Sequence, residues 1–207
     1  MSDRDPVSPE TRRQRMKVGF IGTGRIGGNL ARLLAAGGHE VLLSATNPAG
    51  PQQLADELGG SARAMPTLDA IAAAEVMVIA VWWEAFGEIA QQYGTALQGR
   101  IIIDPSNPIT EQNGEVVALT IPDGLTSPQY QLRRLGSVRS VRTFGDRVAD
   151  ALLTDGQRGQ RDGQRTDMRY WSDDPEAAAL VIPLIRDAGF IPVDGGGLAE
   201  SKNAGDA

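Results

Sequence analysis

The sequence predicts an α/β protein with a doubly wound, mainly parallel sheet and helices on both of its faces. Short apolar runs alternate with helix-like segments along most of the 207 residues, which is typical of βαβ units. Residues 76–81 (VMVIAV) form a continuous apolar run, as strands buried on both faces of a sheet do. A glycine-rich turn between the first apolar run and the first helical segment completes the pattern.

That turn reads GTGRIG over residues 22–27, directly after the apolar run of Val18, Phe20 and Ile21. A strand, G-x-G-x-x-G and a helix make the phosphate-binding turn of a Rossmann-like fold. The first glycine permits the tight turn, the second lets the backbone approach a pyrophosphate, and the third brings the helix against the strand. The alternative is a glycine-rich turn that binds nothing. The predicted contacts of this loop are Gly22, Thr23, Gly24, Arg25, Ile26 and Gly27.

The other elements follow from apolar spacing, prolines and capping residues. Leu54 and Leu58 give an apolar stripe to a helix that Pro51 opens, and Thr67 can cap the next helix. Residues 154–167 (TDGQRGQRDGQRTD) are low in complexity and predict a mobile loop. The remaining predicted strands are residues 40–44, 62–64, 76–81, 101–103, 138–144, 168–171 and 190–193, and further helices are expected after residues 83, 127 and 174.

Length and composition limit the classes of protein. We predict one domain over residues 16–198, a disordered N-terminal arm over residues 1–15 and a short polar tail over residues 199–207. The net charge of −6 makes a nucleic-acid partner unexpected. The absence of cysteine excludes disulfides and thiolate metal sites. No apolar run reaches the roughly 20 residues of a membrane span, so we expect a cytoplasmic protein that binds no membrane.

The residues after the second strand bear on the choice of cofactor. In such folds a carboxylate at this place accepts hydrogen bonds from the 2′-hydroxyl of NAD. No carboxylate stands between Glu40 and Asp56. Ser44, Thr46 and Asn47 would instead meet a 2′-phosphate, and Arg25 can supply the cation, so we expect NADP rather than NAD. The alternative is an ordinary turn, because these residue types suit turns anyway.

With these residues placed, the chain resembles the coenzyme F420-dependent NADP oxidoreductase family over about residues 16–198. The segments that carry the resemblance are MKVGFIGTGRIG, GHEVLLS, VMVIAVWWEAF, IIIDPSNPI, VRTFGD and WSDDPEAAALVIPLIRDAGFIPVDGGGL. Where family members often have Lys-x-Phe-Asn, this chain has RTFG over residues 142–145. The resemblance implies a compact homodimer that binds NADP along the carboxyl ends of the strands, with a deazaflavin against the nicotinamide.

The resemblance also implies where the two redox rings lie. It puts the loop after the fourth strand beside the sugar and nicotinamide, although one of Trp82 and Trp83 is expected to pack in the core. Asn107 can bond the nicotinamide side, or only mark a turn before Pro108. The further predicted cofactor contacts are Ser44, Thr46, Asn47, Ala80, Val81, Trp82 and Asn107, and the predicted contacts of the second substrate are Trp83, Phe144, Gly196 and Leu198.

No residue is predicted to be catalytic in its own right. The only histidine, His39, stands at the start of the second strand, away from the ligand end. The two lysines, Lys17 and Lys202, lie at the edges of the predicted domain. Asp173 and Asp174 precede Pro175 and are expected to cap a helix rather than to bind a metal. Hydride transfer between two bound rings needs closeness and orientation more than an acid or a base.

The expected function is therefore an NADP-dependent oxidoreductase that transfers hydride between NADPH and coenzyme F420 or a flavin-like acceptor. An NADPH reductase of another small molecule, such as a flavin, a ferric chelate or an imine, is the second possibility. A protein that binds NADP as a sensor or partner, without catalysis, is the third.

Overall fold

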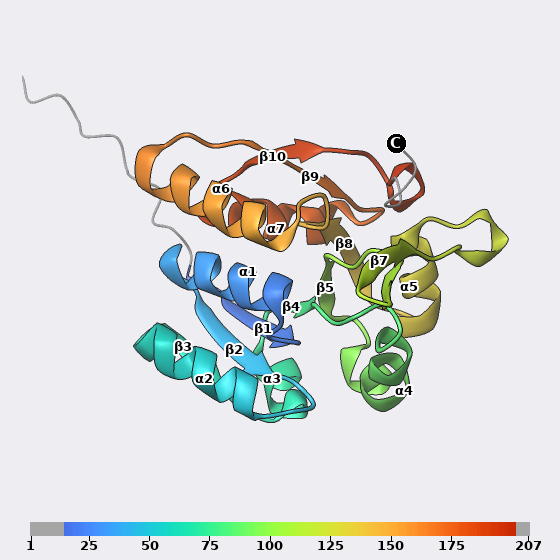
Figure 1. Cartoon of the computed structure of the whole chain (residues 1–207), viewed down its shortest axis with the longest axis horizontal. Coiled ribbons are helices and arrows are strands. Elements are labelled where there is room, and N and C mark those ends of the chain that lie inside the picture. Colours follow the sequence, from blue (N-terminus) through green and yellow to red (C-terminus); the bar gives the residue numbers. More distant parts are fainter. Residues whose placement is uncertain (1–14, 202–207) are drawn as a thin grey trace, which may run out of the picture.

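The computed structural model describes residues 15–201. Its main sheet has eight strands in the order β10-β9-β8-β5-β4-β1-β2-β3, with helices on both faces (Figure 1). The predicted fold class is confirmed. The strands are β1 Lys17–Ile21, β2 Glu40–Ser44, β3 Ala62–Ala64, β4 Val76–Ile79, β5 Ile101–Asp104, β8 Arg139–Thr143, β9 Asp167–Trp171 and β10 Ile191–Asp194. The helices are α1 Arg25–Ala36, α2 Ala49–Leu58, α3 Thr67–Ala73, α4 Phe86–Leu97, α5 Ser127–Leu135, α6 Ala149–Asp162 and α7 Pro175–Asp187.

The strand directions decide where a ligand can lie. β3, β2, β1, β4, β5 and β8 pair in parallel, whereas β9 is antiparallel to β8 and β10 is parallel to β9. The carboxyl ends of six strands therefore share one edge of the sheet. Open sheets of this kind bind ligands in the crevice at that edge.

Side chains that alternate along the central strands pack in two separate hydrophobic cores, one on each face of the sheet. Val76 and Val78 of β4 pack in a cluster with side chains of α1, α2, α6 and α7. Met77 and Ile79 pack in a second cluster with side chains of α3, α4 and α5. Because both faces of β4 are covered, its sequence is apolar at every position.

The prediction of a mobile loop over residues 154–167 is wrong, because helix α6 continues to Asp162. Its glycines serve packing instead of flexibility. A Cβ at Gly156 would lie 2.6 Å from a methyl carbon of Leu33, and one at Gly159 would overlap the Gly189 carbonyl oxygen. The side chain of Gln160 donates to the carbonyls of Leu33 and Asp187 at 2.8 and 2.6 Å. Two glycines and a glutamine of this segment therefore serve the close packing of α6 against Leu33 and the residues that follow α7.

Two further segments differ from expectation. A two-stranded antiparallel hairpin, β6 Ile109–Gln112 and β7 Glu115–Ala118, stands between β5 and α5, where no strand was predicted. The predicted C-terminal tail begins inside a short helical turn, Leu198–Glu200, and Ser201 is buried. The predicted N-terminal arm lies outside the described residues except for Arg15. No helix within residues 15–201 is long and apolar enough to cross a membrane.

Asp174 and Arg139 tie the start of α7 to the start of β8. The Asp174 carboxylate caps the Ala177 N–H at 2.9 Å and accepts two bonds from the Arg139 guanidinium at 2.6 and 2.9 Å. The bonds from Arg139 lower the pKa of Asp174 to about 2, with a smaller part from the Ala177 N–H. The predicted role of Asp174 as a helix cap agrees with this geometry.

We expect Asp174→Asn to remove up to about 1 kcal/mol of stability near neutral pH, because asparagine caps equally well but carries no charge. Since the folded pKa is lowered, the charged contribution is present above about pH 4 and is lost as the pH falls towards 2. Urea unfolding at several pH values should show the deficit shrink in that window. Asp69→Asn, in the first turn of α3, is the control, and an equal deficit at all pH values would contradict the argument.

Candidate functional site

The loop after β1 has the geometry that a bound pyrophosphate requires. Gly22 has φ 98°, which favours glycine, and a Cβ there would overlap the Ala80 carbonyl oxygen. A Cβ at Gly27 would overlap the Gly22 carbonyl oxygen. Around Gly24, in contrast, no heavy atom lies within 4 Å of a built Cβ. The two outer glycines close the turn, and the middle one faces open space.

Helix α1 begins at this open space without a side-chain cap. Its N-cap residue is Gly24, which makes no side-chain cap bond, and its first turn has no acidic residue. The first N–H groups of a helix have no intrahelical partner and carry partial positive charge. The site therefore fits the phosphates of a dinucleotide by its backbone alone.

The end of β2 contributes a hollow without charge. Ser44 is buried and its hydroxyl donates to the Phe20 carbonyl at 2.6 Å, so the prediction that Ser44 binds the cofactor phosphate does not fit this structure. Thr46 and Asn47 are exposed, and the Asn47 Oδ1 accepts the Ala49 N–H at 3.0 Å. The hollow is lined by Ala45, Thr46, Asn47, Pro48, Ala49, Pro51, Gln52, Ala64, Met65 and Pro66, none of them ionisable.

Arg25 turns towards α6. Its guanidinium lies 2.9 Å from the Asp150 carboxylate, in the first turn of α6. Asn29 of α1 donates to the Ala149 carbonyl at 2.8 Å, so the starts of the two helices lie side by side. Both charged side chains of the pair are more than three-quarters exposed, and such pairs contribute little. Arg25 can therefore leave Asp150 when a phosphate binds.

The two tryptophans after β4 have different environments. Trp82 is 56% exposed, whereas Trp83 is 8% exposed and stacks on Tyr130 with ring centroids 5.6 Å apart. The Arg134 guanidinium lies 5.5 Å from the Tyr130 ring on α5. Trp83 therefore fixes the loop against α5, and its predicted contact with a second substrate does not fit. One of the two packs in the core, as the sequence led us to expect.

The predicted walls of the second ring are also largely internal. Phe144 is fully buried and meets Phe190 edge to face, with centroids 6.3 Å apart. The Leu198 side chain is buried, and its carbonyl accepts the Thr126 hydroxyl at 2.6 Å. Neither side chain can line a ligand pocket in this structure. Gly196 is exposed in the turn after β10 and lies beside Ser172, whose N–H it accepts.

Asn107 lies at the carboxyl end of β5, as predicted, but its side chain is engaged. Its Nδ2 donates to the Gly145 carbonyl at 2.8 Å, and its Oδ1 accepts the Arg142 guanidinium at 2.7 Å. Asp104, which ends β5, is fully buried, and burial raises its pKa against the opposing charge of Arg142. A buried arginine at the carboxyl end of β8 was not among the predicted site residues.

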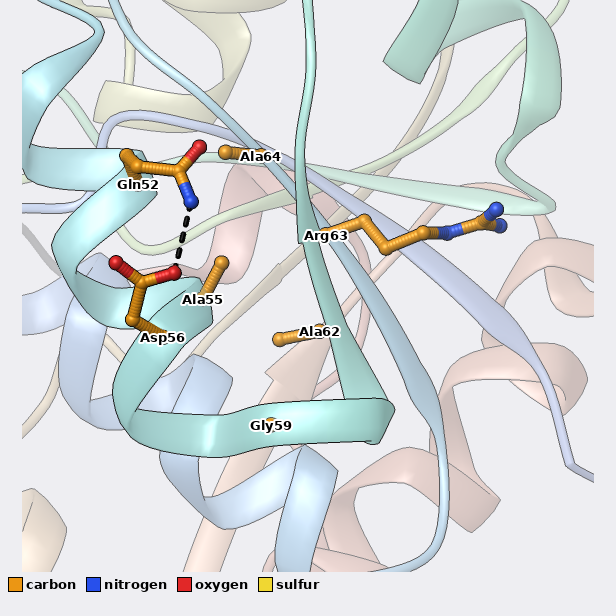
Figure 2. A pocket seen from close by; sticks show the side chains of 7 residues that line it. All are labelled: Gln52, Ala55, Asp56, Gly59, Ala62, Arg63 and Ala64. Atoms are coloured by element: carbon orange, nitrogen blue, oxygen red, sulfur yellow. Dashed lines mark hydrogen bonds between the residues drawn. The ribbon is translucent and has the colours of Figure 1, made fainter.

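Another surface hollow lies between α2 and β3 (Figure 2). Gln52 donates to Asp56 at 2.8 Å along α2, and the Arg63 side chain points away from that helix. The hollow reaches Gly59 and Ala62, at the start of β3. It extends along the whole of β3 to Ala64, which also lines the hollow after β2. No cluster of potential metal ligands occurs in the part of the chain that the structure describes.

The sheet order, the open glycine loop and the uncapped start of α1 define a Rossmann-like α/β fold. Residues 17–108 match the family model described as "NADP oxidoreductase coenzyme F420-dependent", so the first half of the chain is similar to that family.

A curated relative extends the comparison to 97% of the chain. Metalloreductase STEAP3 of Rattus norvegicus is 28% identical over 200 residues, which are 97% of this chain and 38% of the relative. The chain thus spans about two fifths of that relative's length.

Solved structures show the same fold. A protein assigned as an F420-dependent NADP reductase from Arthrobacter sp. FB24 has a TM-score of 0.74 at 22% identity, over 88% of this chain and 86% of its own. The hypothetical protein SMa0349 of Sinorhizobium meliloti has a TM-score of 0.78 at 23% identity, over 95% and 94%. An imine reductase from Pseudomonas sp. has a TM-score of 0.65 at 18% identity, over 90% and 57%.

Proposed function

We propose that this chain transfers a hydride between NADPH and coenzyme F420 or a flavin-like acceptor. The observation that carries the proposal is the glycine loop, where the space over Gly24 lies open at an uncapped helix start. The family match over residues 17–108 supports the choice of NADP and of a deazaflavin acceptor. A homodimer in which a second copy shields the nicotinamide end from water remains a prediction of the resemblance.

Different loops at the carboxyl ends of the strands would bind different parts of the dinucleotide. The start of α1 holds the pyrophosphate, and the hollow with Thr46 and Asn47 holds the ribose of the adenosine half. The loops after β4, β5 and β8 receive the nicotinamide half, with Ala80 and Val81 beside Gly22 and the exposed Trp82 next in the chain. Bound NADPH supplies the hydride itself. The residues of the chain bind, orient and exclude water, and none is assigned a proton transfer.

A ferric complex is a second candidate acceptor. The relative STEAP3 bears the name metalloreductase, and its likeness to this chain extends over 97% of the chain. A flavin that accepts a hydride from NADPH can pass the electrons singly to such a complex, and the chain would then hold NADPH and the flavin against each other.

The test is anaerobic oxidation of NADPH, followed by the loss of its nicotinamide absorbance, with F420, FMN, FAD, a ferric chelate, a cyclic imine or no acceptor. We expect turnover with F420 or a flavin. Binding of NADPH without turnover with any acceptor would contradict the proposal and favour a sensor or partner role.

Arg25→Ala is expected to weaken NADPH by about 1–3 kcal/mol and NADH much less, if the guanidinium leaves Asp150 and bonds the 2′-phosphate. Calorimetric titration with both dinucleotides measures the difference. Equal weakening of NADPH and NADH would place Arg25 on the part that the two cofactors share. Arg32→Ala is a control, because Arg32 on the same helix pairs with Glu57.

His39→Asn should leave NADPH binding and turnover unchanged while reducing stability. His39 is buried, its Nδ1 accepts the Met16 N–H at 3.2 Å, and its Nε2 lies 3.2 Å from the Asp187 carboxylate. Loss of these contacts should cost about 1–3 kcal/mol, measured by urea unfolding. A folded variant that binds NADPH normally but turns over about a hundredfold more slowly would mean that His39 takes part in catalysis.

A further inference from the structure

A buried polar network joins the carboxyl ends of β5 and β8. Arg142 is 1% exposed and is the largest fully buried side chain among the described residues. Its guanidinium donates to the Ser106 carbonyl and, at 2.7 Å, to the Asn107 Oδ1. Asn107 then donates to the Gly145 carbonyl at 2.8 Å. Ser106, Asn107, Arg142 and Gly145, here called the Arg142 clamp, thus tie the loop after β5 to the loop after β8.

The backbone on either side of Arg142 packs closely around its guanidinium group. Asp104 and Arg142 are paired in the register of β5 and β8, and Asp104 accepts the Ser106 N–H at 2.8 Å. Phe144 has φ 65°, a conformation that non-glycine residues rarely adopt, and its ring is anchored in the core. A Cβ at Gly145 would lie 3.1 Å from an Arg142 guanidinium nitrogen. The chain therefore folds back closely over the arginine.

Stability of the fold alone does not account for this network, because several of its buried polar atoms have no hydrogen-bond partner within residues 15–201. Among the described residues, Asp104 Oδ2, Ser106 Oγ and Arg142 Nε are buried and have no hydrogen-bond partner. Each such group carries a desolvation penalty, and apolar replacements of buried charges are often as stable or more so. Strained backbone and unsatisfied polar groups gather where geometry serves a ligand. The clamp lies at the edge of the sheet where the nicotinamide half is proposed to bind.

We propose that Arg142 is a positioning residue for the nicotinamide end of the dinucleotide, acting through Asn107 and Gly145. The clamp holds residues 105–108 and 144–146 as one rigid surface, so that the ring is received in a fixed orientation. The inference rests on the proposed function. It differs from the sequence-based role of Asn107, because both ends of that amide serve the clamp rather than the ligand.

The test compares two ligands that share only the adenosine end. NADPH reaches both halves of the site, whereas adenosine 2′,5′-bisphosphate lacks the nicotinamide half. Arg142→Lys replaces the two guanidinium nitrogens, each of which bonds one partner, by a single ammonium without that fixed fork, and Asn107→Ala cuts the link to Gly145. We expect each variant to raise the Kd of NADPH about tenfold or more, as loss of a charge-assisted bond does, and to leave the Kd of the bisphosphate within about twofold.

Two further readouts separate positioning from general damage. The fluorescence of bound NADPH, which reports the nicotinamide surroundings, should move towards that of free NADPH in both variants. The double variant should weaken NADPH no more than either single change, because both remove one network. Arg139→Lys, on the same strand but paired with Asp174, is the matched control and should change neither affinity.

Each outcome decides the inference. Equal weakening of both ligands, or of neither, by Asn107→Ala would overturn the positioning role, and this half-buried loop residue can be tested even if Arg142→Lys does not fold. If the parent chain binds both ligands, and the fluorescence of bound NADPH is the same in every variant as in the parent chain, the clamp does not position the nicotinamide. Failure of the parent chain to bind either ligand would overturn the proposed function itself, and the inference with it.

Discussion

A Gly24→Val protein is expected to fold normally and to lose at least about a hundredfold in NADPH affinity, because the valine would fill the space that the pyrophosphate needs. Gly24 has φ −68° and ψ −162°, a conformation open to other residues. No heavy atom lies within 4 Å of the added Cβ. The change therefore removes the ligand site without straining the loop.

Gly27→Val is the contrasting variant in the same loop. Its Cβ would overlap the Gly22 carbonyl oxygen, so helix α1 could not pack against the turn. We expect this variant to have both a lower stability and a lower affinity for NADPH. Thermal unfolding by circular dichroism and calorimetric titration of both variants make the comparison. Normal NADPH binding by folded Gly24→Val would show that the pyrophosphate does not cross Gly24.

Gly159→Ala is expected to destabilise the fold by about 1–3 kcal/mol or more, as overpacking of a close contact does. The added methyl group would overlap the Gly189 carbonyl oxygen, which faces α6 where the chain passes from α7 to β10. Neither partner is a flexible side chain, so relief requires that the backbone of one segment move. Alanine has a higher helix propensity than glycine, so without the close contact Gly159→Ala would raise the free energy of unfolding. A decrease therefore indicates the contact with Gly189.

Gly94→Ala supplies the control. Gly94 lies inside α4 and no heavy atom is within 4 Å of a built Cβ. Alanine there should stabilise by up to about 1 kcal/mol through helix propensity and a less flexible unfolded chain. Urea unfolding of the two variants should therefore give shifts of opposite sign. Stabilisation by Gly159→Ala would mean that α6 and Gly189 do not touch as the structure has them.

The fold was predictable because its main signals are local. Buried parallel strands are apolar at each position, as residues 76–79 are. The glycine spacing of residues 22–27 couples a strand to a helix within one short segment. The carboxylate-free stretch after β2 could likewise be recognised from adjacent residues alone.

The features that sequence analysis missed depend on partners distant in the chain. Gly156 and Gly159 resemble loop residues until Gly189 is placed against them. The stacking of Trp83 on Tyr130 requires the loop between β4 and α4 to lie against α5.

The Arg142 clamp shows the same limit within the site. Arg142 and Asn107 are 35 residues apart, and only the pairing of β5 with β8 brings them together. The motif at residues 142–145 marked a departure from the family pattern without indicating that the arginine is buried.

The central claim is that this chain binds NADPH at the glycine loop. Its most direct test is calorimetric titration of the parent chain with NADPH and with NADH. We predict one NADPH bound per chain, with NADH distinctly weaker, because the hollow after β2 carries no carboxylate to bond the 2′-hydroxyl of NADH, and Arg25 can leave Asp150 to bond the 2′-phosphate of NADPH. Absence of NADPH binding, or equal dissociation constants for the two dinucleotides, would contradict the account.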